Sequence, residues 1–298
     1  MKSFADRVVA RVRELGHPLC VGLDPHLGRI PPLFRRGSMT PGDEATAAAV
    51  EEFLLAIVDR VAGRVAAVKP QIAFFEQLGW RGLRVLDSVI RRARDAGLLI
   101  VMDAKRGDIG STAVGYANAF LGADAPFPSD ALTVNPWLGL DTLQPFIDRA
   151  RQTDSGLFVL VKTSNPGAGD LQDRQLVDGR PVWHALADAL AEHAETMVGE
   201  SGWSSLGVVV GATRPELARE ARERLPKSLF LIPGFGAPGA SAADAVAGLG
   251  GGLEGGLINS SRGVIFPASG ESGDRQVWEQ AVDEALERAV DQLRKVAE

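Results

Sequence analysis

A short segment at 103–108, DAKRGD, carries two carboxylates and a lysine directly after an apolar run. Residues two apart in an extended strand share a face, so we expect Asp103 and Lys105 to point the same way at a strand end. Asp108 follows Gly107, where we expect the chain to turn into a helix. Flanking carboxylates favour the ammonium form of Lys105, which suits it to donate a proton and to stabilise developing negative charge. A purely structural ion network is the alternative.

A second group of residues has the composition of a phosphate-binding site. The segment 233–239, PGFGAPG, follows an apolar run, and 259–263, NSSRG, ends the next one. Gly234 and Gly236 leave backbone N–H groups accessible, and Arg262 adds a guanidinium beside them. The formal GxGxxG match is weak evidence for a dinucleotide, because that motif opens the first strand–helix unit and this one follows six other strands. Two glycine-rich turns with a surface arginine are the alternative.

Eight apolar or β-branched runs alternate with helical patterns, and these elements must position the polar residues. The runs are continuous rather than alternating, as in parallel strands that are buried on both faces. They lie at 18–23, 65–70, 98–103, 131–135, 157–163, 206–211, 228–233 and 256–260. Eight strands with interposed helices, such as those expected at 44–62 and 83–93, predict an α/β fold of the (β/α)8 TIM-barrel type. A doubly wound open sheet is the alternative.

Six polar residues fall at the carboxyl ends of these strands, the end where barrels carry their active sites. They are Asp24, Lys69, Asp103, Lys105, Asn135 and Ser164. We therefore expect these side chains to converge on one barrel mouth. Two long connections, 28–43 and 165–181, follow the first and fifth strands on the same side. Loops of this length are lids or binding loops, or equally tolerated insertions.

Composition limits the class of protein. The 298 residues include 32 Lys+Arg and 38 Asp+Glu, a formal net charge of −6, so the broad positive field needed for non-specific nucleic-acid binding is lacking. We see no repeat and no low-complexity linker, and predict one domain over 1–298. A single cysteine, Cys20, excludes an internal disulfide framework and favours a cytoplasmic location. We expect neither a signal peptide nor a membrane span.

The sequence offers no pattern typical of a metal or an organic cofactor. The four histidines, His17, His26, His184 and His193, lack HExxH or similar ligand spacing, and no CxxC or GxSxG occurs. We predict a site without a metal ion or cofactor. A fixed ammonium is then the available stabiliser of developing negative charge.

The segment DAKRGDIGST at 103–112 closely resembles the signature of orotidine 5′-phosphate decarboxylases, the family that catalyses the last step of UMP synthesis. Further matches are VGLDPH, VKPQIAFFE, TVNPWLG, KTSNPG, PGFGA and SSRG, which run in order over nearly the whole chain. The long loops and the residues of the KPQIAFFE and VNPWLG motifs are similar to those of a longer bacterial subgroup of this family. The resemblance implies a TIM barrel that converts orotidine 5′-phosphate (OMP) to UMP and CO2 without a cofactor.

The resemblance also implies catalytic roles. Lys105 would protonate C6 of the pyrimidine once carbon dioxide leaves, and Asp103 would lie beside the departing carboxylate. Lys69 would connect Asp103 to the ribose hydroxyls. Asp108 and Thr112 would reach into the site of a neighbouring subunit, which implies a homodimer with shared active sites.

Binding roles follow from the same resemblance. The implied substrate-binding residues are Asp24, Thr112, Asn135, Ser164, Gly234, Gly236 and Arg262. Asp24 would bind the ribose, Ser164 the pyrimidine amide, and Arg262 with the glycine backbone the 5′-phosphate. The chain departs from the family at Pro238, where a glutamine commonly spans phosphate and base.

Three rival functions remain open at this point. Sugar-phosphate decarboxylases or synthases on a related barrel use a magnesium ion and carry an acid where this chain has Lys69, and a lysine repels a cation. A Schiff-base aldolase needs a neutral Lys105 or Lys162 with a depressed pKa, which nearby carboxylates oppose. A catalytically dead nucleotide sensor would have lost the central residues, but Asp103, Lys105 and Asp108 are all present.

Overall fold

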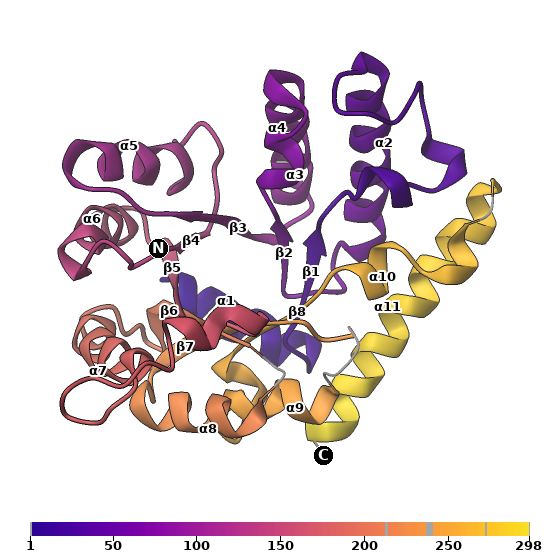
Figure 1. The fold of residues 1–298 in the computed structure, drawn as a ribbon. Coiled ribbons are helices and arrows are strands. Elements are labelled where there is room, and N and C mark those ends of the chain that lie inside the picture. The colour runs from indigo at the N-terminus through magenta and orange to yellow at the C-terminus, as the bar shows by residue number, and fades with distance from the viewer. Residues whose placement is uncertain (1, 212–213, 237–240, 272, 298) are drawn as a thin grey trace.

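Eight parallel strands close into a barrel in the computed structural model, which describes residues 2–211, 214–236, 241–271 and 273–297 (Figure 1). The strands follow one another around the barrel in chain order, and the eighth pairs with the first. They are β1 (Leu19–Leu23), β2 (Ala67–Pro70), β3 (Leu99–Arg106), β4 (Ala131–Val134), β5 (Gly156–Lys162), β6 (Ser204–Val210), β7 (Ser228–Pro233) and β8 (Gly256–Ser260). The predicted TIM barrel is confirmed, and the open sheet is excluded.

Helices cover the outside of the barrel between the strands (Figure 1). Within the described residues they are α1 (Phe4–Leu15), α2 (Glu44–Val61), α3 (Ala73–Glu76), α4 (Gly79–Asp95), α5 (Gly110–Phe120), α6 (Gln144–Gln152), α7 (Val182–Glu195), α8 (Pro215–Arg224), α9 (Ala242–Val246), α10 (Arg262–Ile265) and α11 (Arg275–Ala297). The helix expected at 44–62 matches α2, and the one expected at 83–93 lies inside α4. None of these helices is both long enough and apolar enough to cross a membrane.

Helix α1 closes the amino end of the barrel. Phe4 lies edge-on to Phe158 of β5, with ring centroids 5.9 Å apart, and the Ala5 N–H donates to Ser205 of β6. These residues belong to an interior apolar cluster that also holds Cys20 and Leu257. The amino end of the barrel is therefore covered largely by apolar side chains.

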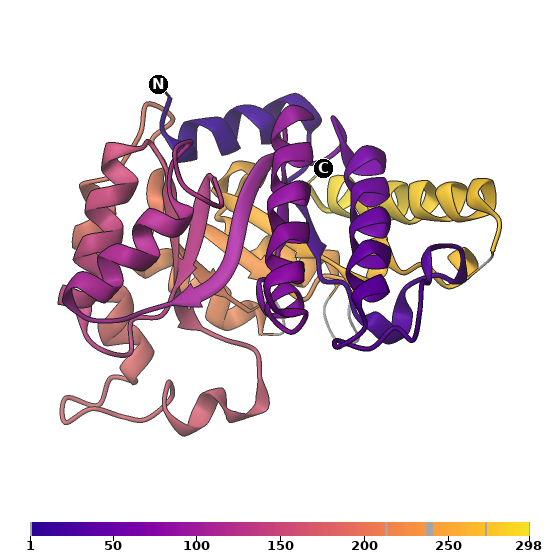
Figure 2. The ribbon, with the colours of Figure 1, turned by 90° about the horizontal axis from the view of Figure 1, so that it is seen from above.

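The two long connections differ in how closely they lie to the barrel. The segment after β1 contains two short 3₁₀ turns, η1 (Leu27–Arg29) and η2 (Pro32–Phe34), and its residues Ile30 and Phe34 are fully buried. The segment after β5, 165–181, extends away from the barrel (Figure 2). The first connection is therefore well placed to line a site at the mouth.

Candidate active site

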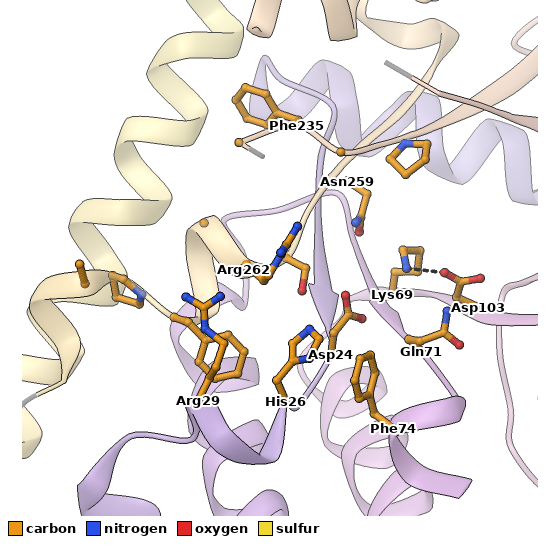
Figure 3. A pocket seen from close by; sticks show the side chains of 18 of the residues that line it. Asp24, His26, Arg29, Lys69, Gln71, Phe74, Asp103, Phe235, Asn259 and Arg262 are labelled. Atoms are coloured by element: carbon orange, nitrogen blue, oxygen red, sulfur yellow. Dashed lines mark hydrogen bonds and ion pairs between the residues drawn. The ribbon is translucent and has the colours of Figure 1, made fainter. Parts of the chain in front are cut away.

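A cavity of about 830 Å³ opens at the carboxyl end of the barrel (Figure 3). The ends of β1, β2, β3, β7 and β8, with the segments that follow them, supply its walls. Of the residues predicted from sequence, Asp24, Lys69, Asp103, Gly234, Gly236 and Arg262 line it. Six of the predicted positions are thus brought together by strands that are distant in the chain.

Asp103 lies between two lysines. Its Oδ2 accepts a hydrogen bond from Nζ of Lys69 at 2.6 Å, and its Oδ1 accepts one from Nζ of Lys105 at 2.5 Å. Lys69 and Asp103 are buried, with 4% and 7% of their surface exposed, whereas the side chain of Lys105 is 45% exposed. A buried ion pair therefore anchors a second ammonium that remains exposed to solvent.

The two lysines keep Asp103 ionised. Burial alone would raise the pKa of Asp103, but the charges and hydrogen bonds of Lys69 and Lys105 outweigh it and hold the pKa well below its usual range. Burial alone would likewise lower the pKa of Lys69, but Asp103 and then Asp24 raise it above its ordinary value. The group carries fixed charges at neutral pH, before any ligand binds.

The backbone around Lys105 is not a regular strand. Lys105 has φ of 48°, and the pairing of β3 with β4 shifts register between Met102 and Arg106. The hydroxyl of Thr133 on β4 accepts from the N–H groups of Ala104 and Lys105, at 3.0 and 2.9 Å. The same hydroxyl donates to Oδ1 of Asp103 at 3.0 Å. Asp103 and Lys105 do meet as expected, but a bulge held by Thr133 brings them together rather than simple strand alternation.

Three buried polar atoms around the cavity have no hydrogen-bond partner among the described residues. They are Oδ1 of Asp24, Oδ1 of Asn259 and Oγ of Ser261, all from residues that line the cavity. Buried polar groups in native structures are nearly always paired, so these atoms are suited to contact a polar ligand. Asn259 and Ser261 were not among the predicted site residues, although the NSSRG motif contains both.

The glycine-rich segment and Arg262 form the other end of the cavity, away from Lys69 and Asp103 (Figure 3). Gly234 and Gly236 have φ of 99° and 80°, a conformation that favours glycine. A Cβ on Gly236 would also lie 3.2 Å from Oγ of Ser260. The absence of side chains therefore leaves the backbone of this segment open to a ligand. Pro238 lies outside the described residues.

Other predicted residues do not line this cavity within the chain. Ser164 lines a separate cavity of about 260 Å³, where the buried Lys162 donates to Asp173 at 2.6 Å. The side-chain oxygen of Asn135 accepts from the N–H of Trp137. Lys105 does not line the cavity either, although its ammonium contacts Asp103, which does. Of the six strand-end residues that were expected to converge, only Asp24, Lys69 and Asp103 therefore line one cavity.

Asp108 and Thr112 also lie apart from the cavity. The carboxylate of Asp108 accepts from the adjacent N–H of Ile109 and forms no ion pair with Lys105 in the described chain, so only Asp103 flanks this lysine. Thr112 is exposed on α5. Neither side chain contributes to its own chain's cavity.

Comparison with known proteins agrees with this geometry. The model of the orotidine 5′-phosphate decarboxylase / HUMPS family matches residues 17–271. The chain belongs to this family. An orotidine 5′-phosphate decarboxylase from Rhodopirellula baltica is 43% identical over 99% of this chain and 100% of its own, and one from Streptomyces coelicolor is 44% identical over 89% and 90%.

Solved structures of the family have the same fold. A Leishmania donovani OMP decarboxylase is 34% identical, with a TM-score of 0.74 over 98% of this chain and 99% of its own. A chain from Streptomyces avermitilis gives a TM-score of 0.84 at 38% identity, over 100% of this chain and 96% of its own.

Several residues of the site were not predicted from the sequence. The cavity is also lined by His26, Arg29, Gln71 and Phe74, and the hydroxyl of Thr133 donates a hydrogen bond to Asp103. Gln71 and Phe74 lie in the VKPQIAFFE motif. That motif indicated the family but did not by itself indicate that these two side chains line the cavity. No cluster of three or more His, Cys, Asp or Glu side chains suited to a metal ion occurs among the described residues.

The bulge at Lys105 should depend on the hydroxyl of Thr133. Thr133→Val keeps the shape of the side chain but leaves two N–H groups and one carboxylate oxygen without this partner. We expect it to lower the free energy of unfolding by about 1–3 kcal/mol. Urea unfolding of Thr133→Val and of Thr133→Ser, which keeps the hydroxyl, measures the difference. A valine variant as stable as the serine variant would contradict this role.

Proposed function

We propose that this chain decarboxylates orotidine 5′-phosphate to UMP and CO2, the last step of UMP synthesis. The observation that carries the proposal is the Lys69–Asp103–Lys105 group, with its accessible ammonium at the barrel mouth. The family and the names of the 43% and 44% identical relatives support it.

The substrate would lie along the cavity with its two anionic groups at opposite ends. Arg262 and the N–H groups at Gly234 and Gly236 would hold the 5′-phosphate. The unpaired oxygens of Asp24 and Asn259 would accept hydrogen bonds from the ribose hydroxyls. These contacts direct the pyrimidine toward Lys105.

The reaction then needs one bond broken and one formed. The C6–carboxylate bond breaks, its electron pair stays on C6, and CO2 leaves from beside Asp103. Lys105 donates a proton from Nζ to C6, and the neutral amine takes a proton from water afterwards. Because Asp103 already holds this ammonium at 2.5 Å, little reorganisation is needed as charge develops. Binding of the remote phosphate helps to order the site around the ring.

Lys69 argues against the magnesium-dependent rival. That rival needs an acid at the end of β2, whereas this chain places a buried ammonium there, bound to Asp103 at 2.6 Å. A cation beside Lys69 would be repelled, and Asp103 is already engaged by two lysines. We therefore propose that the reaction requires no metal or organic cofactor.

We further propose that the chain acts as a homodimer with shared sites. Ile109 and Val114 are exposed apolar side chains near Asp108 and Thr112 in the sequence, and Trp137 and Leu138 are exposed in the segment that follows β4. Gly107 brings the two segments together, since a Cβ there would lie 2.6 Å from the carbonyl oxygen of Asn135. Exposed apolar patches of this kind mark protein interfaces. Asp108 and Thr112 of one subunit would then complete the site of the other.

Remaining roles are proposed on the family resemblance. Ser164 would contact the pyrimidine amide and Asn135 would assist substrate binding, although neither lines the main cavity in this chain. We also propose that residues 1–298 work as one domain in the cytoplasm. Cys20, the single cysteine, is buried, and burial raises its pKa to about 12, so it has no role in the chemistry.

The function is tested by the loss of OMP absorbance in the presence of a metal chelator. Wild-type protein should convert OMP. The turnover rate of Lys105→Ala should be lower by about 10³-fold or more, while its affinity for UMP should change little. The reason is that the ammonium acts on charge that appears in the transition state. Lys227→Ala, which removes an exposed lysine paired with Glu195, is the matched control. Near-normal turnover of Lys105→Ala would refute its role, and activity restored only by magnesium would refute the cofactor-free reaction.

The shared site is tested by mixing two inactive variants. Lys105→Ala and Asp108→Asn should each be nearly inactive alone. After the two are unfolded and refolded together, about half of the dimers are hybrids with one intact site, so about a quarter of wild-type activity should return. Verified hybrids without recovered activity would place Asp108 in the site of its own chain.

A further inference from the structure

Arg29 is a second arginine at the phosphate end of the cavity. It ends the η1 turn after β1, whereas Arg262 begins α10 after β8, and both line the cavity. Figure 3 shows the two side chains at the same end, on the side away from Lys69 and Asp103. Neither guanidinium forms a hydrogen bond or an ion pair with another residue that the structure describes. Both are therefore available to an anionic ligand.

The side chain of Arg29 rests on an aromatic ring that is fixed in place. Its guanidinium carbon lies 5.4 Å from the centre of the Phe266 ring, within the range of a cation–π contact. Phe266 is buried and stacks on Phe53 of α2, with centroids 5.3 Å apart. Phe266 also follows Arg262 by one helical turn, so a single segment carries one arginine and supports the other.

The backbone of Arg29 is held on both sides. Its N–H donates to the carbonyl of His26 at 2.8 Å. The guanidinium of Arg35 donates to the carbonyls of Gly28 and Ile30, at 3.2 and 2.8 Å. A side chain on so well fixed a turn loses little conformational freedom when it binds a ligand.

The positive charge at this end comes from the arginines rather than from the histidine. Burial, with the charges of Arg262 and Arg29, lowers the pKa of His26 despite the opposing effect of Asp24, so His26 is neutral at pH 7. Arg288 of α11 also lines the cavity, but Glu284 lies 3.7 Å from it and offsets its charge. Among the described residues, Arg29 and Arg262 are thus the two cations at this end that have no carboxylate partner.

We propose that Arg29 binds the 5′-phosphate together with Arg262. A phosphate monoester carries a charge of about −1.5 to −2 at pH 7, which one arginine cannot neutralise, and each guanidinium can offer two parallel N–H donors. The inference rests on the proposed function only for the identity of the phosphate ester. It gives the connection after β1 a role in ligand recognition.

The test compares UMP with uridine, which lacks the phosphate, by calorimetric titration of the full chain. Arg29→Ala should weaken UMP binding about ten- to a hundredfold and leave uridine binding unchanged, as expected for the loss of a charged hydrogen-bonding group. Arg29→Gln, which keeps most of the stem, should lose UMP affinity in the same way. Arg84→Ala is the matched control, because Arg84 also lies over an aromatic ring, Trp80 at 5.6 Å, but outside the cavity.

UMP affinity within twofold of wild type in both Arg29 variants would overturn the inference, as would equal losses for UMP and uridine. OMP turnover by the wild-type protein is measured in parallel. If the wild type does not turn over OMP but Arg29→Ala selectively loses UMP binding, the proposed function fails and the role of Arg29 stands.

Discussion

The buried ion pair between Lys69 and Asp103 is the interaction on which the site depends. Removing two charges from water is costly, and the cost is recovered only when geometry and further hydrogen bonds are good. Here the carboxylate accepts from two lysines and from the Thr133 hydroxyl, so both of its oxygens are engaged. The pair is stable only while β2, β3 and β4 keep their register. A mobile barrel mouth could not hold such a group in place.

The barrel supplies that register in a simple way. Lys69 and Asp103 lie at the ends of adjacent parallel strands, where Gln71 is bridged to Asp103. Helix α1 covers the opposite end with apolar side chains, so the cavity opens at the carboxyl end. The cavity then has Lys69 and Asp103, with Lys105 bound to Asp103, at one end, and at the other two arginines that form no ion pair with the residues the structure describes. Two separated regions of positive charge suit a ligand with a carboxylate and a phosphate at its two ends.

Much of this arrangement could be predicted from the sequence, because it depends on patterns within short segments of the chain. Continuous apolar runs located all eight strands, and polar residues at their ends identified Asp24, Lys69 and Asp103 as neighbours. Gly234, Gly236 and Arg262 were found in the same way, because loops after the seventh and eighth strands meet in any barrel.

The rest depends on contacts that no local pattern contains. The left-handed backbone of Lys105 is held by a hydroxyl from the next strand, and Thr133 lies in the ordinary apolar run at 131–135. The guanidinium of Arg29 packs on the ring of Phe266, which lies more than two hundred residues away in the chain. Asn135 and Ser164 had the correct strand-end positions, but one uses its carboxamide locally and the other faces a separate cavity. Strand order predicts which ends are close, whereas the direction of each side chain depends on its tertiary neighbours.

The proposed chemistry requires Asp103 to stay ionised between its two lysines in the ligand-free protein. The carboxyl carbon of Asp103, assigned by the loss of its NMR signal in Asp103→Asn, reports this directly during a pH titration. We predict no protonation of Asp103 across the acidic range in which the protein remains folded, because its pKa lies below the ordinary value of 3.8. A titration midpoint at or above 3.8 would contradict the fixed charge group on which the proposed chemistry depends.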